Sequence, residues 1–256
     1  MDLDLAGRVY IVSGGSKGLG FATAQALVSE GARVIVIGRS ADDVDAAVDV
    51  LGDAAAGLAA DLGGPDTAGA AVALAMTRFG RLDGGLISVG GPPAGTPLTT
   101  TDDQWRSAFE TVFLGSLRLA RTLCEGIAAA GMSATGSIAW VLSTSAVEVF
   151  PGLTTSNGLR PGLAMLITDL ADEVGPTGIR VNGLLPGRIA TARLAALDES
   201  TGDAAASRER ASARIPLRRY GEPTEFGRVA AFVLSPAASD LTGSLVRVDG
   251  GATRHP

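Results

Sequence analysis

Hydrophobic positions along the chain fall into seven short runs, and most of the stretches between them carry apolar residues at helical spacing. Most of the runs are nearly continuous, which is typical of strands buried on both faces of a parallel sheet. The pattern predicts strands at about 8–13, 33–37, 57–60, 84–89, 136–143, 179–185 and 245–248. It predicts helices at about 18–30, 41–51, 66–79, 102–130, 155–174 and 223–234.

This alternation predicts the fold class. Strands that alternate with helices are expected to form an α/β, doubly wound domain of the Rossmann type, with a mostly parallel seven-stranded sheet and helices on both faces. A length of 256 residues suits one such domain over residues 1–256, and the sequence shows no internal repeat and no long linker.

The segment 188–220 interrupts the alternation. It carries seven arginines and four acidic residues, a net charge of +3 in a chain of net charge −6. One interpretation is an insertion that covers the sheet edge as a substrate lid and receives an anionic substrate. The other is a solvated helical segment whose charges pair with one another.

Composition narrows the classes of partner. No apolar run approaches the roughly 18 residues of a membrane span, and the acidic N-terminal residues do not resemble a secretory signal. The negative net charge argues against nucleic acid or an anionic membrane as partner. Cys124 is the only cysteine, which fits a reducing compartment and predicts a cytoplasmic protein. His255 is the only histidine, so neither a histidine-rich metal site nor a Ser-His-Asp triad is expected.

A glycine-rich loop supplies the first candidate chemistry. The sequence SGGSKGLG at 13–20 follows the first predicted strand and opens the first predicted helix. Gly14 permits a tight turn, Gly18 lets backbone N–H groups approach a pyrophosphate, and Gly20 allows close packing of helix and sheet. The helix N-terminus then offers free donors to phosphates. The cofactor contacts expected here are Gly14, Ser16, Lys17, Gly18, Leu19 and Gly20; the alternative is a glycine-rich turn without a ligand.

The end of the second strand indicates which dinucleotide is bound. A site for NAD would carry an acidic residue there, whereas this chain has Arg39 and Ser40. The guanidinium of Arg39, helped by Lys17, suits the 2′-phosphate of NADP(H), unless both side chains are simply solvated. After the third strand, Asp61 and Leu62 are expected near the adenine, although Asp61 fits a helix cap equally well.

Together these residues resemble the short-chain dehydrogenase/reductase family from about residue 7 to 253. The loop matches the family's TGxxxGxG with Ser13 in place of threonine, and LLPGRIAT at 184–191 resembles its Pro-Gly motif. IPLRRYGEP at 215–223, LTGSLVRVDGG at 241–251 and Gly-Gly-Pro-Pro at 90–93 are similar to the subgroup near 3-oxoacyl carrier-protein reductases. The resemblance implies an NAD(P)-dependent oxidoreductase, commonly a tetramer. It also implies nicotinamide contacts at Gly90, Pro186, Gly187, Ile189 and Thr191.

The resemblance fails at the family's catalytic residues. Its serine position falls on Ser143, but its tyrosine, lysine and asparagine positions fall on Ser156, Arg160 and Val112. The only tyrosines are Tyr10 and Tyr220 and the only lysine is Lys17, so no Tyr-x-x-x-Lys spacing exists. A serine hydroxyl is a much weaker acid than a phenol, and arginine stays protonated at any working pH.

Three functions are compatible with this combination. The first is an NADP(H)-dependent oxidoreductase acting on a carbonyl or hydroxyl substrate, in which Ser143, Ser156 and Arg160 hold a substrate oxygen. The second is a catalytically silent NADP(H)-binding subunit or sensor. The third is a non-redox lyase or isomerase on the same fold. By resemblance, the helices at 102–130 and 155–174, with Ala164, Leu166 and Ile167, are expected to form the interfaces of a homotetramer, with a dimer as the alternative.

Overall fold

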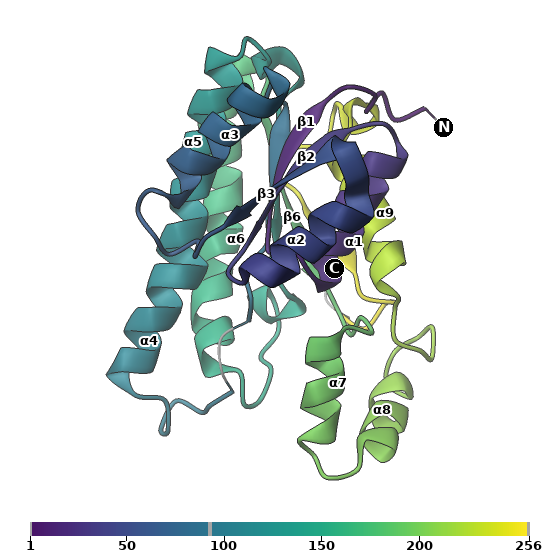
Figure 1. Ribbon diagram of the computed structural model, residues 1–256. Coiled ribbons are helices and arrows are strands. Elements are labelled where there is room, and N and C mark those ends of the chain that lie inside the picture. The colour runs from purple at the N-terminus through teal and green to yellow at the C-terminus, as the bar shows by residue number, and fades with distance from the viewer. Residues whose placement is uncertain (1, 92–93, 255–256) are drawn as a thin grey trace.

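One parallel sheet organises the molecule. The computed structural model describes residues 2–91 and 94–254 (Figure 1). All strand pairs are parallel, and the strand order is β3-β2-β1-β4-β5-β6-β7. The strands are β1 (Val9–Ser13), β2 (Arg33–Gly38), β3 (Ala55–Ala59), β4 (Gly84–Ile87), β5 (Ser137–Val141), β6 (Arg180–Pro186) and β7 (Leu245–Val248). The order reverses direction between β1 and β4, which is where open α/β sheets bind their ligands.

Helices cover both faces of this sheet. Figure 1 shows α3 (Thr67–Phe79), α5 (Gly115–Ala129) and α6 (Thr154–Val174) on one face, and α1 (Gly18–Ser29), α2 (Ala41–Leu51) and α9 (Pro223–Leu234) on the other. Each face has its own apolar core. One contains Ile11, Leu123 and Ile167, and the other contains Leu27 and Phe226. Burial on both faces explains why the strands read as continuous apolar runs.

The first helix packs against the last one. α1 and α9 lie side by side over the centre of the sheet, and their backbones approach closely where Gly227 faces Ala22. A Cβ at Gly227 would overlap the carbonyl oxygen of Ala22, so only glycine fits there. This contact joins residues about two hundred positions apart in the sequence.

The structure refines two of the predicted segments. The helix predicted over 102–130 is α4 (Asp102–Ala108), a π-helical turn η2 (Phe109–Leu114) and then α5. The segment 188–220, predicted to interrupt the alternation, contains α7 (Ala192–Glu199) and α8 (Ala204–Ser212). Thr191 and Asp203 cap these two helices, because each side chain accepts a hydrogen bond from a backbone N–H of the first turn.

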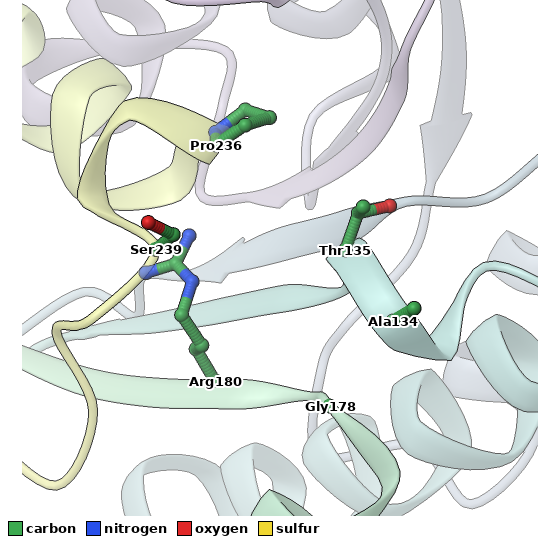
Figure 2. A pocket seen from close by; sticks show the side chains of 6 residues that line it. All are labelled: Ala134, Thr135, Gly178, Arg180, Pro236 and Ser239. Carbon is green, nitrogen blue, oxygen red and sulfur yellow. The ribbon is translucent and has the colours of Figure 1, made fainter.

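A buried arginine, Arg180, lies at the amino ends of the strands, where β6 begins. Arg180 donates from Nη1 to the carbonyls of Val233 (3.0 Å) and Leu241 (3.1 Å), and from Nη2 to that of Ser235 (2.8 Å). Figure 2 shows its guanidinium beside Ser239, at a cavity of about 70 Å³ that Pro236 also lines. Arg180 therefore holds the end of α9 in place.

Candidate nucleotide and substrate site

A cleft of about 1070 Å³ follows the carboxyl ends of the strands. Every candidate site residue named from the sequence lines it. They are Gly14, Ser16, Lys17, Gly18, Leu19, Gly20, Arg39, Ser40, Asp61, Leu62, Gly90, Ser143, Ser156, Arg160, Pro186, Gly187, Ile189 and Thr191. Of the Gly-Gly-Pro-Pro motif, Pro92 and Pro93 lie outside the described residues, as does His255.

The glycine-rich loop forms the floor of the cleft at the β1–β4 switch point. Gly14 and Gly18 both have a φ of 57°, a conformation that favours glycine. A Cβ at Gly14 would lie 2.7 Å from the carbonyl oxygen of Ser88. Ser13 fixes the two strand ends together, since its Oγ donates to the Ser88 carbonyl (2.9 Å) and accepts from the Ser88 N–H (2.9 Å). The N-terminus of α1 therefore opens into the cleft, as phosphate binding requires.

At the end of β2, the two candidate cations differ in their surroundings. Lys17 Nζ forms an ion pair with Asp43 Oδ2 at 2.7 Å, which holds the pKa of that carboxyl below its usual value. The guanidinium of Arg39 is exposed and has no hydrogen bond or ion pair within residues 2–91 and 94–254. Ser40 caps α2 by accepting from the Asp43 N–H. Arg39 is therefore the cation available to a ligand, and Lys17 is already partly neutralised.

Asp61 has a structural partner as well as a place in the cleft. Its Oδ1 accepts from the Gly63 N–H at 2.8 Å, which closes a tight turn after β3. It does not cap α3, whose N-cap residue is Asp66. Because the carboxylate also lines the cleft, the turn and a contact with the adenine are compatible.

Three serines and one arginine form a hydrogen-bonded chain below the cleft. Ser143 Oγ accepts from the Ser145 N–H (3.1 Å), and its own hydroxyl hydrogen has no acceptor among the described residues. Ser145 Oγ and Ser156 Oγ share a hydrogen bond of 2.8 Å. Arg160 donates from Nε to Ser156 Oγ (3.1 Å) and from Nη1 to the Val141 carbonyl (3.0 Å). Ser143 therefore has a hydroxyl hydrogen that is free to be donated to an oxygen in the cleft.

This serine–arginine chain contains no acid with a pKa near neutrality. Burial, and then the charge of Arg193, lower the pKa of Arg160 to about 10, so its guanidinium stays protonated in neutral solution. Val112 lies in the π-helical turn and presents an apolar side chain to the cleft. The chain of side chains can therefore bind and polarise an oxygen, but it supplies no efficient proton donor.

Tyr220, which lies near α7 and α8, does not supply the proton donor that the serine–arginine chain lacks. It is buried and is not among the residues that line the cleft. Its hydroxyl donates to Asp198 Oδ2 (3.1 Å) and accepts from Arg188 Nη1 (3.2 Å). Burial is also the first cause that raises the pKa of the phenol. Tyr220 therefore joins α7 to the segment that follows α8.

Two further residues of this site are not evident from the sequence. Arg193, in the first turn of α7, extends into the cleft and donates from Nη1 to the Gly91 carbonyl at 2.6 Å. In the sequence it counts only as one of seven arginines, although the capping residue Thr191 just before it marks a helix start. Ser145 has no local signal, because its role depends on contact with Ser156, eleven positions away.

Two features of the described residues concern metal ions and membranes as partners. Within the described residues, no group of three or more His, Cys, Asp or Glu side chains is placed to hold a metal ion. In the same part of the chain, none of the helices has the length and apolar character needed to cross a bilayer.

Comparisons with known proteins agree with this geometry. A family model described as Enoyl-(Acyl carrier protein) reductase matches residues 14–253. The chain is 31% identical over 255 residues to a 2,5-dichloro-2,5-cyclohexadiene-1,4-diol dehydrogenase of Sphingobium indicum, with 98% of both chains covered. It is 33% identical over 254 residues to a cis-4-hydroxycyclohexanecarboxylate dehydrogenase of Sinomonas cyclohexanicum, with 97% of both covered.

A solved structure extends the agreement to the fold. L-sorbose reductase from Gluconobacter frateurii, in complex with NADPH and L-sorbose, superposes with a TM-score of 0.93 at 27% identity, and 100% of both chains is covered. The expected family and the doubly wound fold are thus both confirmed. Because the family model matches residues 14–253 and relatives above 30% identity span nearly the whole chain, the chain belongs to the short-chain dehydrogenase/reductase family.

Proposed function

We propose that this oxidoreductase uses NADP(H) to interconvert a carbonyl and a hydroxyl group on a small molecule. The observation that supports NADP(H) most directly is Arg39, an exposed guanidinium without a protein partner among the described residues, at the end of β2. An arginine fork at this position binds a 2′-phosphate through charge-assisted hydrogen bonds, whereas a carboxylate would favour NAD.

Under this proposal, most of the remaining cleft residues contact the cofactor, and Ser143 and Arg160 contact the substrate. The residues of the 14–20 loop hold the diphosphate, and Asp61 and Leu62 contact the adenine. Gly90 and residues 186–191 border the nicotinamide. When bound, the nicotinamide supplies or accepts a hydride at the substrate carbon. Ser143 donates its free hydroxyl hydrogen to the substrate oxygen, and Arg160 adds a fixed positive charge beside it.

The proton needs another source than a side chain. By the family resemblance, Ser156 and Arg160 fall at the positions of the family's proton-transfer pair, and neither side chain exchanges a proton easily at neutral pH. We propose that water or the substrate supplies it. The same observation favours the second candidate function, a silent NADP(H)-binding subunit. In either case we propose a cytoplasmic homotetramer.

Titration calorimetry tests the cofactor assignment. We expect wild type to prefer NADPH over NADH by about 1–3 kcal/mol, the range of charge-assisted hydrogen bonds. Arg39→Ala should remove most of that preference, whereas the matched control Arg214→Ala, an exposed arginine outside the cleft, should keep it. Equal affinities in wild type would refute the NADP(H) assignment, and binding of neither nucleotide would refute the function itself.

Incubation with NADPH and a panel of carbonyl compounds separates the candidates. Oxidation of NADPH supports the oxidoreductase. Tight binding without turnover supports the binding subunit, and conversion without net oxidation indicates a lyase or isomerase.

A further inference from the structure

Arg160 is a buried cation without a counterion. Its side chain is 5% exposed, and no carboxylate of the described residues forms an ion pair with it. Nε and Nη1 donate to neutral oxygens, and Nη2 donates to none of the described residues. Burying an ionised group without an opposite charge costs several kcal/mol, so proteins rarely retain one without a function. Because Arg160 lines the cleft, an anion in the cleft can supply the missing charge.

The other buried arginine shows the contrast. Arg180 uses both terminal nitrogens on backbone carbonyls, at the edge of the sheet opposite the cleft (Figure 2). Each of its terminal nitrogens already donates to a backbone carbonyl, which gives it an evident structural role. Arg160 has one terminal nitrogen, and so two N–H donors, left for a ligand.

A second guanidinium, from α7, lines the same cleft as Arg160. Arg193 lies in the first turn of α7 and lines the same cleft. Its charge is the second of the two causes, after burial, that lower the pKa of Arg160. A cation in the first turn of a helix also opposes the helix dipole, so this position does not favour stability. Asp103, an acidic residue of the cleft wall, is exposed and pairs with Arg106 on its own helix.

We propose that the substrate carries a carboxylate, or an equivalent anionic oxygen group, that binds between Nη2 of Arg160 and the guanidinium of Arg193. This inference rests on the proposed function and adds the substrate class to it. Arg160 belongs to the core and Arg193 to the lid, so one anion would join the two parts of the site. A neutral ketone or alcohol would leave the charge of Arg160 uncompensated.

Thermal unfolding of the whole protein tests the anion site without any turnover. The probes are acetate and its neutral analogue acetamide, at an ionic strength kept constant with sodium chloride. We expect the Tm of wild type to rise with acetate and not with acetamide, because a carboxylate accepts two N–H donors and stabilises the folded state by binding to it. Arg160→Met should abolish the rise, and Arg193→Met should reduce it.

Two further variants keep the result interpretable. Arg180→Met should lower the Tm under all conditions and still show the acetate response. Arg160→Lys, which retains the charge but not the fork, should fold and show a weaker response if Arg160→Met does not fold. An acetate response that is absent in wild type, or unchanged in both Arg160 variants, would overturn the proposal.

A phosphate of the cofactor is an alternative source of the anion, and a second titration distinguishes it from the substrate. Repeating the titration with saturating NADPH should preserve the response if the site belongs to the substrate. Its loss would show that a phosphate of the cofactor occupies the site and would overturn the substrate assignment. Calorimetry with NADPH alone shows independently whether the proposed function holds.

Discussion

At the scale of single residues, we expect the chemistry to depend on Ser156, Arg160 and Val112, which by resemblance fall at the family's tyrosine, lysine and asparagine positions. All three line the cleft, and none of their side chains is an acid with a pKa near neutrality. Losing a positioned general acid typically costs about 10²–10⁴ in rate. Reduction of ordinary ketones by wild type is therefore expected to be very slow.

Restoring the three residues should restore part of that rate. We predict that Ser156→Tyr, Arg160→Lys and Val112→Asn together raise NADPH-dependent reduction of simple activated ketones about tenfold or more. Ser156→Tyr alone should do less, because its phenol would lack the lysine that lowers its pKa. The rate of NADPH oxidation is the measurement. A folded, NADPH-binding triple variant without any gain would favour the silent subunit, and wild-type turnover near roughly 10 per second would show that another group supplies the proton.

Cys124 allows a pH-dependent prediction. Burial, and then the charges of Glu173 and Glu125, raise the pKa of its thiol to about 11. The thiolate is the reactive form, so its fraction at about pH 8 is on the order of 100-fold smaller than for an unperturbed thiol. Alkylation by iodoacetamide should be correspondingly slow in the native protein and should become faster as the pH rises to about 11. Fast modification in mildly alkaline solution that does not depend on unfolding would contradict this environment.

At the scale of elements, one polar cluster holds α7 and α8, the two helices of the predicted lid at 188–220. Asp198 on α7 accepts from Ser207 on α8 (2.8 Å) and from Tyr220 (3.1 Å), and Arg188 pairs with it at 3.5 Å. These bonds join both lid helices to the chain on either side of them. Apart from this cluster, α7 and α8 have few buried apolar contacts, because Asp198 is the only buried residue of the two helices.

Removing the phenol oxygen should therefore loosen the lid. We predict that Tyr220→Phe destabilises α7 and α8 by about 1–2 kcal/mol, the scale of a buried hydrogen bond. Hydrogen exchange should become faster in residues 192–212. The matched control is Tyr10→Phe, whose hydroxyl donates to the Leu234 carbonyl at 3.3 Å and should leave the exchange of the lid unchanged. Equal exchange of the lid in both variants would show that other contacts hold it.

The helices and strands also show which features of the fold can be predicted from the sequence. All seven strands and the main helices are found from apolar periodicity and glycine positions, which are local signals, and the 13–20 loop locates the cleft. The π-helical turn at Phe109–Leu114 is not found, because one extra residue in a helix turn barely changes the pattern. The partners of Lys17 and Arg193 are not found either, because an ion pair or a carbonyl contact depends on which groups the fold brings together.

At the scale of the whole molecule, one surface suggests how copies assemble. Two of the residues expected at an interface, Ala164 and Ile167, pack into the chain's own core, so that part of the interpretation was wrong. Their neighbour Met165 is 72% exposed, and Phe109 on the adjacent π-helical turn is 41% exposed and stacks on Phe113. Exposed apolar side chains on α6 and η2 provide a face that a second copy can cover.

We predict that Met165→Glu converts the assembly to smaller species, because a charge would be buried in the interface. Light scattering at micromolar concentration should show a tetramer, or a dimer, for wild type. Val50→Glu, at a similarly exposed apolar residue on α2, should leave the mass unchanged. A monomeric wild type would refute the assembly, and an unaffected Met165→Glu would place the interface elsewhere.

The packing of α1 against α9 has a consequence for how the chain matures on the ribosome. A nascent chain is made from its N-terminus, so α1 emerges about two hundred residues before its partner at Pro223–Leu234. β1, β2 and β3 can meet by residue 59, but the side of α1 that packs against α9, and the face of β4, β5 and β6 that α9 covers, stay open until α9 arrives. Nascent chains that stall before residue 223 should therefore be the species that chaperones retain, and a premature stop there should yield aggregates rather than a smaller active protein.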